Sequence, residues 1–254
     1  EREGIAIDSQ FLKNYSGQLG NQLAELEAGI KAMAGMDFNV DSPKQLGDVL
    51  FEHLKISSKA KKTKTGQYAT SEDVLQSLAN SHPIIPKILE YREYKKLKST
   101  YVDPLPTMKD TVDGRIHTQF MQTVTATGRL SSNNPNLQNI PIRTEAGREI
   151  RKSFVAKNED YELLAADYSQ IELRIIAALS EDKNMVAAFQ SGEDIHAATA
   201  SKVYGVALNN VSREQRSAAK AVNFGIIYGQ SAFGLSQNLG ISRTEAKQII
   251  DSYF

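Results

Sequence analysis

Two cations and then two aromatic side chains follow one another at a constant spacing of four residues: Arg216, Lys220, Phe224 and Tyr228. In an α-helix, residues four apart differ by only about 40° around the axis and about 6 Å along it, so these side chains would form one stripe. The cations lie toward the N-terminal end, where the helix dipole and unbonded N–H groups favour anions. The stripe therefore matches a nucleoside triphosphate, although an ordinary amphipathic helix with core aromatics and solvated cations has the same pattern.

Two local signals bound the helix that carries this stripe. Ser212 and Gln215 form a Ser-x-x-Gln capping box, which satisfies backbone N–H groups at a helix N-terminus. Gly229 directly follows the last ring, and glycine commonly ends a helix because it adopts the left-handed conformation easily. The sequence therefore predicts one helix between these two signals.

A carboxylate at the end of an apolar segment is the second feature with chemical potential. Residues 162–167 read as a strand that ends at Asp167, and a helix follows at once. A carboxylate with neighbouring backbone carbonyls suits Mg²⁺, which takes hard oxygen ligands and bridges to substrate phosphates. The alternative is structural, with Asp167 and Ser169 capping the next helix and Ser169 forming a Ser-x-x-Glu box with Glu172.

Taken together, these motifs resemble the polymerase domain of family A DNA polymerases, the bacterial DNA polymerase I type. The metal motif reads Asp-Tyr-Ser-Gln-Ile-Glu-Leu-Arg from Asp167, and the helix motif reads Arg-x3-Lys-x3-Phe-x3-Tyr-Gly from Arg216. The resemblance extends to the Lys-rich stretch near residue 60 and to residues 96–101, 125–132, 135–144 and 194–196. It therefore covers almost the whole chain, with several motifs in the order typical of the family.

The resemblance implies template-directed addition of a deoxynucleoside triphosphate (dNTP) to a primer 3′-hydroxyl, with release of pyrophosphate. Two Mg²⁺ ions, with Mn²⁺ as an alternative, would be held by Asp167 and by the backbone carbonyl of Tyr168. Arg216 would hold the terminal phosphate, and Lys220 would hold the phosphate nearest the sugar and protonate the leaving pyrophosphate.

The resemblance also implies which side chains surround the nucleotide. Phe224 would stack on the incoming base and sugar, and Tyr228 would lie by the templating position. Further contacts to the nucleotide are implied for Arg143, Gln170, Glu172 and His196. For His196 the alternative is a packed or capping histidine.

Glu172 separates this interpretation from its nearest rival, the single-subunit RNA polymerase of phage type. A large side chain at this position would block a ribose 2′-hydroxyl, whereas a small one would admit it. We therefore expect deoxynucleotides as substrates.

Several basic and amide side chains are expected to contact primer-template DNA. Lysine clusters bind phosphates through charge, and minor-groove acceptors occupy similar places in every correct base pair, so such contacts would ignore sequence. The alternatives are an ordinary solvated surface for the lysines and a turn for the Asn-rich loop, especially at Asn133 and Asn134. The expected DNA contacts are Lys59, Lys61, Lys62, Lys96, Lys98, Arg129, Asn136, Gln138, Asn139, Tyr228 and Gly229.

Composition agrees with this interpretation without pointing to it. The chain has 254 residues, 41% of them hydrophobic, and its 30 basic and 30 acidic residues cancel. It contains no cysteine, which excludes disulfides and thiolate metal sites. No apolar run is long enough to span a bilayer and no leader opens the chain, so we expect an intracellular protein with no membrane contact. The resemblance implies a monomeric, cytoplasmic, nucleoid-associated bacterial protein, with an organellar location left open.

The resemblance implies an α+β fold with the right-hand polymerase architecture, in which a mostly helical thumb and fingers surround part of an antiparallel palm sheet. The expected domains are a palm-leading segment (1–9), a thumb (10–104), part of the palm (105–178) and part of the fingers (179–254). Helices are predicted at about 10–35 and 72–103, strands at 116–122, 150–156 and 163–167, and short capped helices beyond 179.

The chain departs from the family pattern because the later His-Asp-Glu motif, with the second metal-binding aspartate, does not occur in it. Both ends resemble cuts from a longer polypeptide. We therefore expect this segment by itself to be inactive, and the alternative to an enzyme is a fragment that binds primer-template without chemistry.

Overall fold

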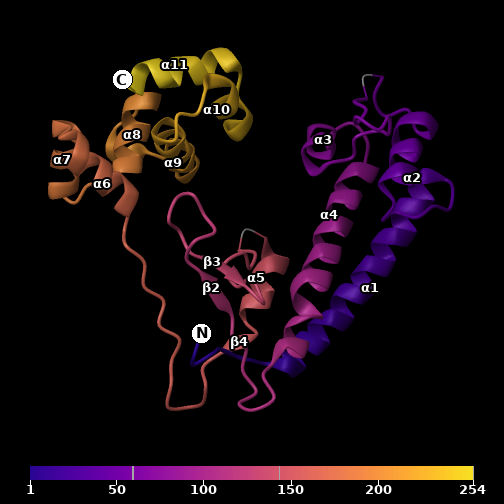
Figure 1. The fold of residues 1–254 in the computed structure, drawn as a ribbon. Helices are drawn as coiled ribbons and strands as arrows, with labels where there is room; N and C mark the ends of the chain where they lie inside the picture. The colour runs from indigo at the N-terminus through magenta and orange to yellow at the C-terminus, as the bar shows by residue number, and fades with distance from the viewer. Residues whose placement is uncertain (59, 143, 254) are drawn as a thin grey trace. The chain divides into compact units, whose positions relative to one another are not determined.

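The computed structural model describes residues 1–58, 60–142 and 144–253, which belong to two compact units, Glu1–Leu164 and Ala165–Phe254 (Figure 1). Helices predominate, and the strands are short antiparallel pairs, so the predicted α+β class is confirmed. None of the described helices is both long and apolar enough to cross a bilayer. The boundaries of thumb, palm and fingers stay predictions.

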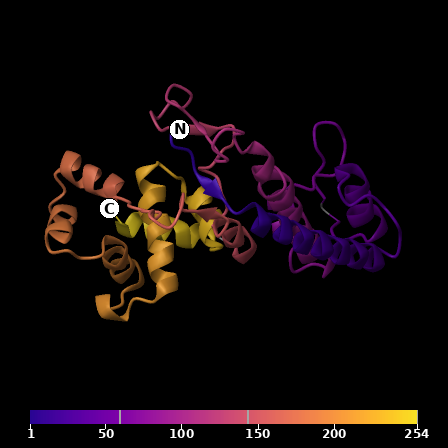
Figure 2. The same ribbon diagram turned by 90° about the horizontal axis from the view of Figure 1, so that it is seen from below.

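Two long helices of the first unit lie side by side, α1 (Ser9–Ala34) and α4 (Ile84–Leu97), as Figure 1 and the view from below in Figure 2 show. Helix α1 begins where the Asp8 carboxylate accepts a hydrogen bond from Phe11 N at 2.8 Å. It ends at Gly35, whose φ of 69° is left-handed, as glycine permits. The helix predicted at 10–35 is therefore confirmed.

The helix predicted at 72–103 is interrupted, so that prediction is wrong in its middle. Helix α3 (Glu72–Ser77) ends well before α4, and turns occupy the intervening residues up to His82. Pro83 explains the break, because proline lacks an N–H group and disfavours helical backbone in the residue before it. Helix α4 then continues directly into a wider helical turn, η2 (Lys98–Val102).

The core of the first unit consists of two clusters of apolar side chains. One joins the C-terminal half of α1 to α4, α3, α2 (Pro43–Asp48) and the short η1 turn (Val49–His53). The other joins the N-terminal half of α1 to η2, the short η3 turn (Leu105–Met108), Ile116 and Ile150. Leu12, Leu19, Ile30, Leu46, Leu50, Ile84, Ile85 and Ile88 are among the side chains that are fully buried.

Two antiparallel strand pairs complete the first unit. Strand β1 (Ala6–Ile7) pairs with β4 (Phe154–Val155), with Ala6 opposite Val155, and β2 (Gln119–Met121) pairs with β3 (Ser131–Asn133), with Phe120 opposite Ser132. The strand predicted at 116–122 is thus shorter than expected.

Two other strand predictions need correction. Ile150 belongs to helix α5 (Glu145–Arg151), which begins where the Thr144 hydroxyl caps Gly147 N, and only residues 154–155 of the predicted strand are extended in a ladder. Residues 163–167 form no regular element and are exposed. A strand requires a hydrogen-bonded neighbour, and no described residue pairs with this segment, so its apolar composition alone does not make it a strand.

The second unit contains helices and turns in its described residues, in agreement with the capping signals beyond residue 179. Val222, Leu235 and Ala246 form its buried centre. The elements are α6 (Ile171–Ser180), α7 (Lys183–Gln190), α8 (Ile195–Tyr204), η4 (Leu208–Asn210), α9 (Arg213–Ile227), α10 (Ala232–Leu239) and α11 (Arg243–Tyr253).

We predict that Ile30→Ala lowers the free energy of unfolding by about 2–5 kcal/mol, because Ile30 is fully buried in the cluster around α4 and alanine leaves a cavity. Met33→Ala, on the same helix but 40% exposed, is the matched control and should change it by less than about 1 kcal/mol. Denaturant titration of both variants measures the difference. Equal losses would contradict the assigned core.

Candidate functional site

Both predicted boundaries of the stripe helix are present in α9. Ser212 N donates to Gln215 Oε1 at 2.9 Å, and Gln215 N donates to Ser212 Oγ at 3.2 Å, which is the reciprocal capping box. At the other end Gly229 has a φ of 67°, and Gln230 N donates to the carbonyl of Gly225 at 2.7 Å. These bonds satisfy the end of the helix and confirm the two local signals.

The stripe itself runs along α9 as the spacing predicts. Arg216, in the first turn of the helix, and Lys220, one turn further along, are both exposed. The rings of Phe224 and Tyr228 lie nearly parallel, at 15°, with centroids 6.4 Å apart. A hollow of about 460 Å³ adjoins the two rings and is also lined by Ala221, Gly225 and Gln230. The hollow is large enough for a flat heterocyclic ligand beside the rings.

His196, at the start of α8, is buried against α9. Its side chain is 2% exposed, its Nδ1 lies 2.9 Å from Asn223 Nδ2, and its ring lies 5.9 Å from that of Phe224. Burial lowers the pKa of His196, and the nearby charges of Arg216 and Lys220 lower it further against the opposing effect of Asp194. His196 is therefore a packed histidine, as the alternative predicted. Its contact with a triphosphate stays a prediction.

Asp194 contacts both α8 and α9. It belongs to the family motif at 194–196 but was not among the expected site residues. Its Oδ1 accepts from His196 N at 2.9 Å and from Ala197 N at 3.2 Å, and its Oδ2 accepts from Arg216 Nε at 2.6 Å. Partial burial raises the pKa of Asp194, but the bonds from Arg216 and from the α8 backbone outweigh this effect and lower it overall. The available signal was an aspartate at a helix N-cap position, two residues before the histidine that was expected in the site.

Helix α6 contributes Glu172 to the same region. The Tyr228 hydroxyl donates to Glu172 Oε2 at 2.8 Å, which joins the first turn of α6 to the C-terminal end of α9. Gln170 precedes α6 with a left-handed φ of 54° and caps the helix with no side-chain bond. The Ser-x-x-Glu capping alternative is therefore not the way in which α6 begins.

Asp167 and Tyr168 lie in the exposed irregular segment before α6, rather than at the end of a strand. In the part of the chain that the structure describes, no hydrogen bond or ion pair joins Asp167 to the stripe on α9, and no three carboxylate or imidazole groups gather as a metal site. The carboxylate and the Tyr168 carbonyl are nevertheless hard oxygen donors of the kind that Mg²⁺ prefers. These two donors fit the expected metal by type and would supply part of its coordination.

The loop with the expected minor-groove contacts is held by bonds to its own backbone. Gln138 Oε1 accepts from Ser132 N at 2.8 Å, and Asn136 Oδ1 accepts from Gln138 N at 3.0 Å. The Tyr101 hydroxyl donates to the carbonyl of Asn139 at 2.5 Å. The Asn136 side chain therefore forms a local turn with its own backbone, as the alternative predicted. The Gln138 side chain uses only its amide oxygen in the bond to Ser132. Arg129 is exposed in the same loop region.

The expected phosphate-binding lysines have different surroundings. Lys61 and Lys96 are exposed, and Lys62 Nζ lies 4.6 Å from the centre of the Tyr68 ring. Lys98 Nζ donates to both oxygens of Asp103 at 2.8 Å, so its charge is already paired within the unit. Lys59 and Arg143 lie outside the described residues.

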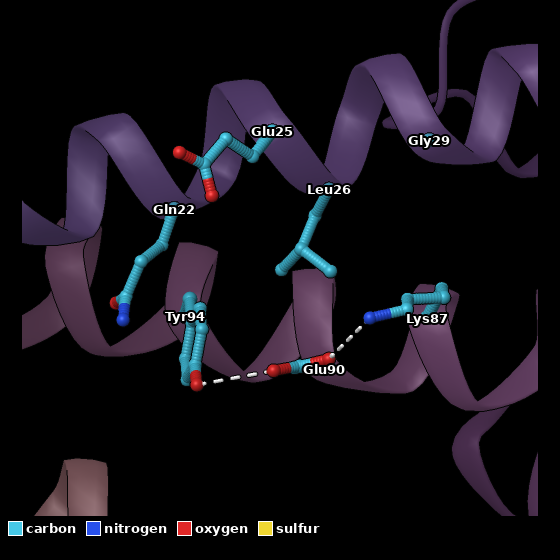
Figure 3. Close-up of a pocket in the computed structure, with 7 residues that line it drawn as sticks. All are labelled: Gln22, Glu25, Leu26, Gly29, Lys87, Glu90 and Tyr94. Atoms are coloured by element: carbon cyan, nitrogen blue, oxygen red, sulfur yellow. Dashed lines mark hydrogen bonds and ion pairs between the residues drawn. The ribbon is translucent and has the colours of Figure 1, made fainter.

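A separate hollow of about 340 Å³ lies between α1 and α4 in the first unit (Figure 3). Glu90 lies on the α4 side of it, 3.7 Å from Lys87 Nζ and 3.2 Å from the Tyr94 hydroxyl on the same helix. Its walls are otherwise formed by Gln22, Glu25, Leu26 and Gly29, so this hollow contains none of the selected residues.

Comparisons with known proteins agree with the motifs. The model of DNA polymerase family A matches residues 9–254. The whole chain is 51% identical to 26% of DNA polymerase I of Deinococcus radiodurans and 50% identical to 30% of the thermostable DNA polymerase I of Thermus aquaticus. It thus spans between a quarter and a third of these curated relatives. A solved structure, the POL domain of Pol1 from M. smegmatis in complex with DNA primer-template and dNTP, is similar with a TM-score of 0.88 and 47% identity, over 99% of this chain and 44% of that one.

We predict that stability falls as the pH drops below 6.5, and that His196 contributes to this fall. An unfolded histidine takes up a proton near pH 6.5, whereas the lowered pKa keeps the folded imidazole neutral to a lower pH. As the pH falls, the unfolded state therefore takes up protons first. The contribution of His196 to the free energy of unfolding is fully present above pH 6.5 and decreases below it. His196→Gln, which has no titrating group, should show a smaller loss between pH 7.5 and 5 in denaturant titrations. Parallel pH profiles of the two proteins would contradict the assignment.

Proposed function

The chain belongs to DNA polymerase family A, and we propose that the whole protein copies a DNA template by adding deoxynucleotides to a primer 3′-hydroxyl. The family resemblance read from the motifs is thereby confirmed. The observation that carries the proposed activity is the stripe on α9, in which exposed cations at the helix start are followed by two parallel rings. The primer-template and dNTP in the similar solved complex support the same partners here.

The cations of α9 would bind the triphosphate. Arg216 lies in the first turn of the helix, where the dipole adds to its positive charge, and Lys220 lies one turn further along. Arg216 would hold the terminal phosphate, and Lys220 would hold the phosphate nearest the sugar. Lys220 Nζ would donate a proton to the pyrophosphate oxygen as that group leaves, which would reduce the negative charge that develops there.

The rings of α9 would bind the base. Phe224 is half-buried and Tyr228 is 64% exposed, and both residues line the hollow at the C-terminal half of the helix. Aromatic faces stack on any base with little dependence on its identity. This tolerance is what a copying enzyme needs, because the template and not the protein selects the nucleotide.

Members of the family generally use a divalent metal. Here the Asp167 carboxylate and the Tyr168 carbonyl would hold two Mg²⁺ ions, or Mn²⁺ ions, together with water and substrate oxygens. When bound, the metal lowers the pKa of the attacking hydroxyl and stabilises charge on the phosphates.

The first unit would bind the duplex. Exposed lysines such as Lys61 and Lys96 would contact phosphates, and Gln138 would donate from its amide nitrogen to minor-groove acceptors. Neither kind of contact reads sequence. In this proposal the whole protein acts as a monomer in the bacterial cytoplasm.

We predict that Asp167→Ala in the whole protein lowers the rate of primer extension by about 1,000-fold, because loss of several kcal/mol of metal-dependent stabilisation corresponds to that factor. Asp160→Ala, at another exposed aspartate before the same irregular segment, is the matched control and should extend primers at the unaltered rate. Single-turnover extension of a labelled primer with saturating dNTP measures both. Full activity of Asp167→Ala would refute the proposed metal-binding role.

We predict that Glu172→Ala increases ribonucleotide incorporation relative to deoxynucleotide by about 100-fold, because removing the side chain opens space for a 2′-hydroxyl. Tyr228→Phe keeps the ring but removes the hydrogen bond that orients Glu172, so it should relax sugar selectivity to a smaller degree. Competition between the two nucleotide types in primer extension measures the ratio. Unchanged selectivity in Glu172→Ala would show that Glu172 is not the sugar gate.

A further inference from the structure

One carboxylate, that of Asp194, contacts both helices that carry the expected triphosphate ligands. Oδ1 accepts two backbone N–H bonds at the start of α8, one of them from His196 itself, at 2.9 and 3.2 Å. Oδ2 accepts from Nε of Arg216, in the first turn of α9, at 2.6 Å. Asp194 therefore sets where the first turn of α8 lies relative to the Arg216 guanidinium.

The atoms in this ion pair leave the phosphate-binding edge of Arg216 available. The bond to Asp194 uses Nε, whereas the fork that best matches a phosphate includes the two terminal nitrogens, which carry most of the N–H groups. An arginine held at Nε has lost part of its rotational freedom before a ligand arrives. The contact therefore orients the guanidinium without occupying it.

Stability alone does not account for this contact. The side chains of Arg216 and Asp194 are 44% and 38% exposed, and ion pairs this accessible to water add little to folding. The capping bonds of Asp194 do stabilise α8, but they need only one of its two oxygens. The second oxygen is thus available for a task other than capping.

We propose that Asp194 is a positioning residue for the triphosphate, holding Arg216 and the His196 end of α8 in the arrangement that receives the phosphates. This inference rests on the proposed function and deepens it by adding a residue that does not touch the substrate. The opposite hypothesis is a latch, in which Asp194 competes with phosphate for Arg216.

Asp194→Asn separates the two tasks of the side chain, because asparagine caps helices as well as aspartate does but carries no charge for Arg216. In the whole protein we expect the dNTP concentration for half-maximal primer extension to rise about tenfold, with the thermal unfolding midpoint unchanged. The substitution also leaves an unpaired positive charge, which by itself would attract phosphate. Weaker binding therefore comes from lost orientation and not from the change in charge.

Asp182→Asn is the matched control. Asp182 caps α7 in the same unit through a bond from Met185 N to Oδ1 at 2.8 Å, and no ion pair involves it within the described ranges. We expect Asp182→Asn to leave dNTP dependence and unfolding unchanged. An equal effect of both substitutions would overturn the proposal in favour of a general loss of helix capping.

Arg216→Ala tests whether Asp194 acts through Arg216. When Arg216 is already alanine, adding Asp194→Asn should raise the half-maximal dNTP concentration by less than about twofold, because the two effects are not independent. Full additivity of the two substitutions would overturn the proposal.

Calorimetry with inorganic tripolyphosphate distinguishes this inference from the proposed function. We expect the whole protein to bind tripolyphosphate and Asp194→Asn to bind it about tenfold more weakly, whether or not primers are extended. Unaltered or tighter binding by Asp194→Asn would overturn the positioning role, and tighter binding would indicate the latch. Absence of primer extension, with the tripolyphosphate difference intact, would refute the polymerase activity alone.

Discussion

A buried hydrogen bond between Asn223 of α9 and His196 of α8 is the contact on which the rest of the candidate site depends. Both side chains are almost fully buried, and the Asn223 amide also accepts from the Thr199 hydroxyl at 3.0 Å. Buried polar groups are costly unless they are paired, so this register of α8 on α9 is favoured over any that separates them. The ring contact of His196 with Phe224 and the ion pair of Asp194 with Arg216 both follow from that register.

Burial of His196 beside two cations affects the charge of the site. A protonated His196 would lie in a poorly solvated position beside Arg216 and Lys220, and its pKa is lowered accordingly. The lowered pKa favours a neutral imidazole beside the two exposed cations over three cations packed together. Because the whole chain carries no net formal charge, attraction of a polyanion has to come from such local groupings.

Local signals in the sequence predicted the parts of the fold that local bonds determine. The ends of α9 follow from Ser212, Gln215 and Gly229, whose hydrogen bonds reach only a few residues along the chain. The strand expected at 163–167 was wrong because strand formation depends on a distant partner that an apolar run does not specify. Asp194 was missed for a related reason, since its role appears only when α8 and α9 are packed together and Arg216 comes within reach.

The nucleotide-binding part and the metal-binding part of the candidate site differ in how far they are organised in advance. Hydrogen bonds between helices orient Arg216, His196 and Glu172, whereas Tyr168 is 80% exposed and Asp167 lies in an irregular segment. One carboxylate and one carbonyl would supply few of the roughly six oxygen ligands that complete an Mg²⁺ shell. Phosphate oxygens held by α9 would supply others. In the proposed enzyme, nucleotide binding and metal binding are therefore linked. The cationic helix α9 is already ordered, so it would bind the phosphates before the Mg²⁺ shell is complete.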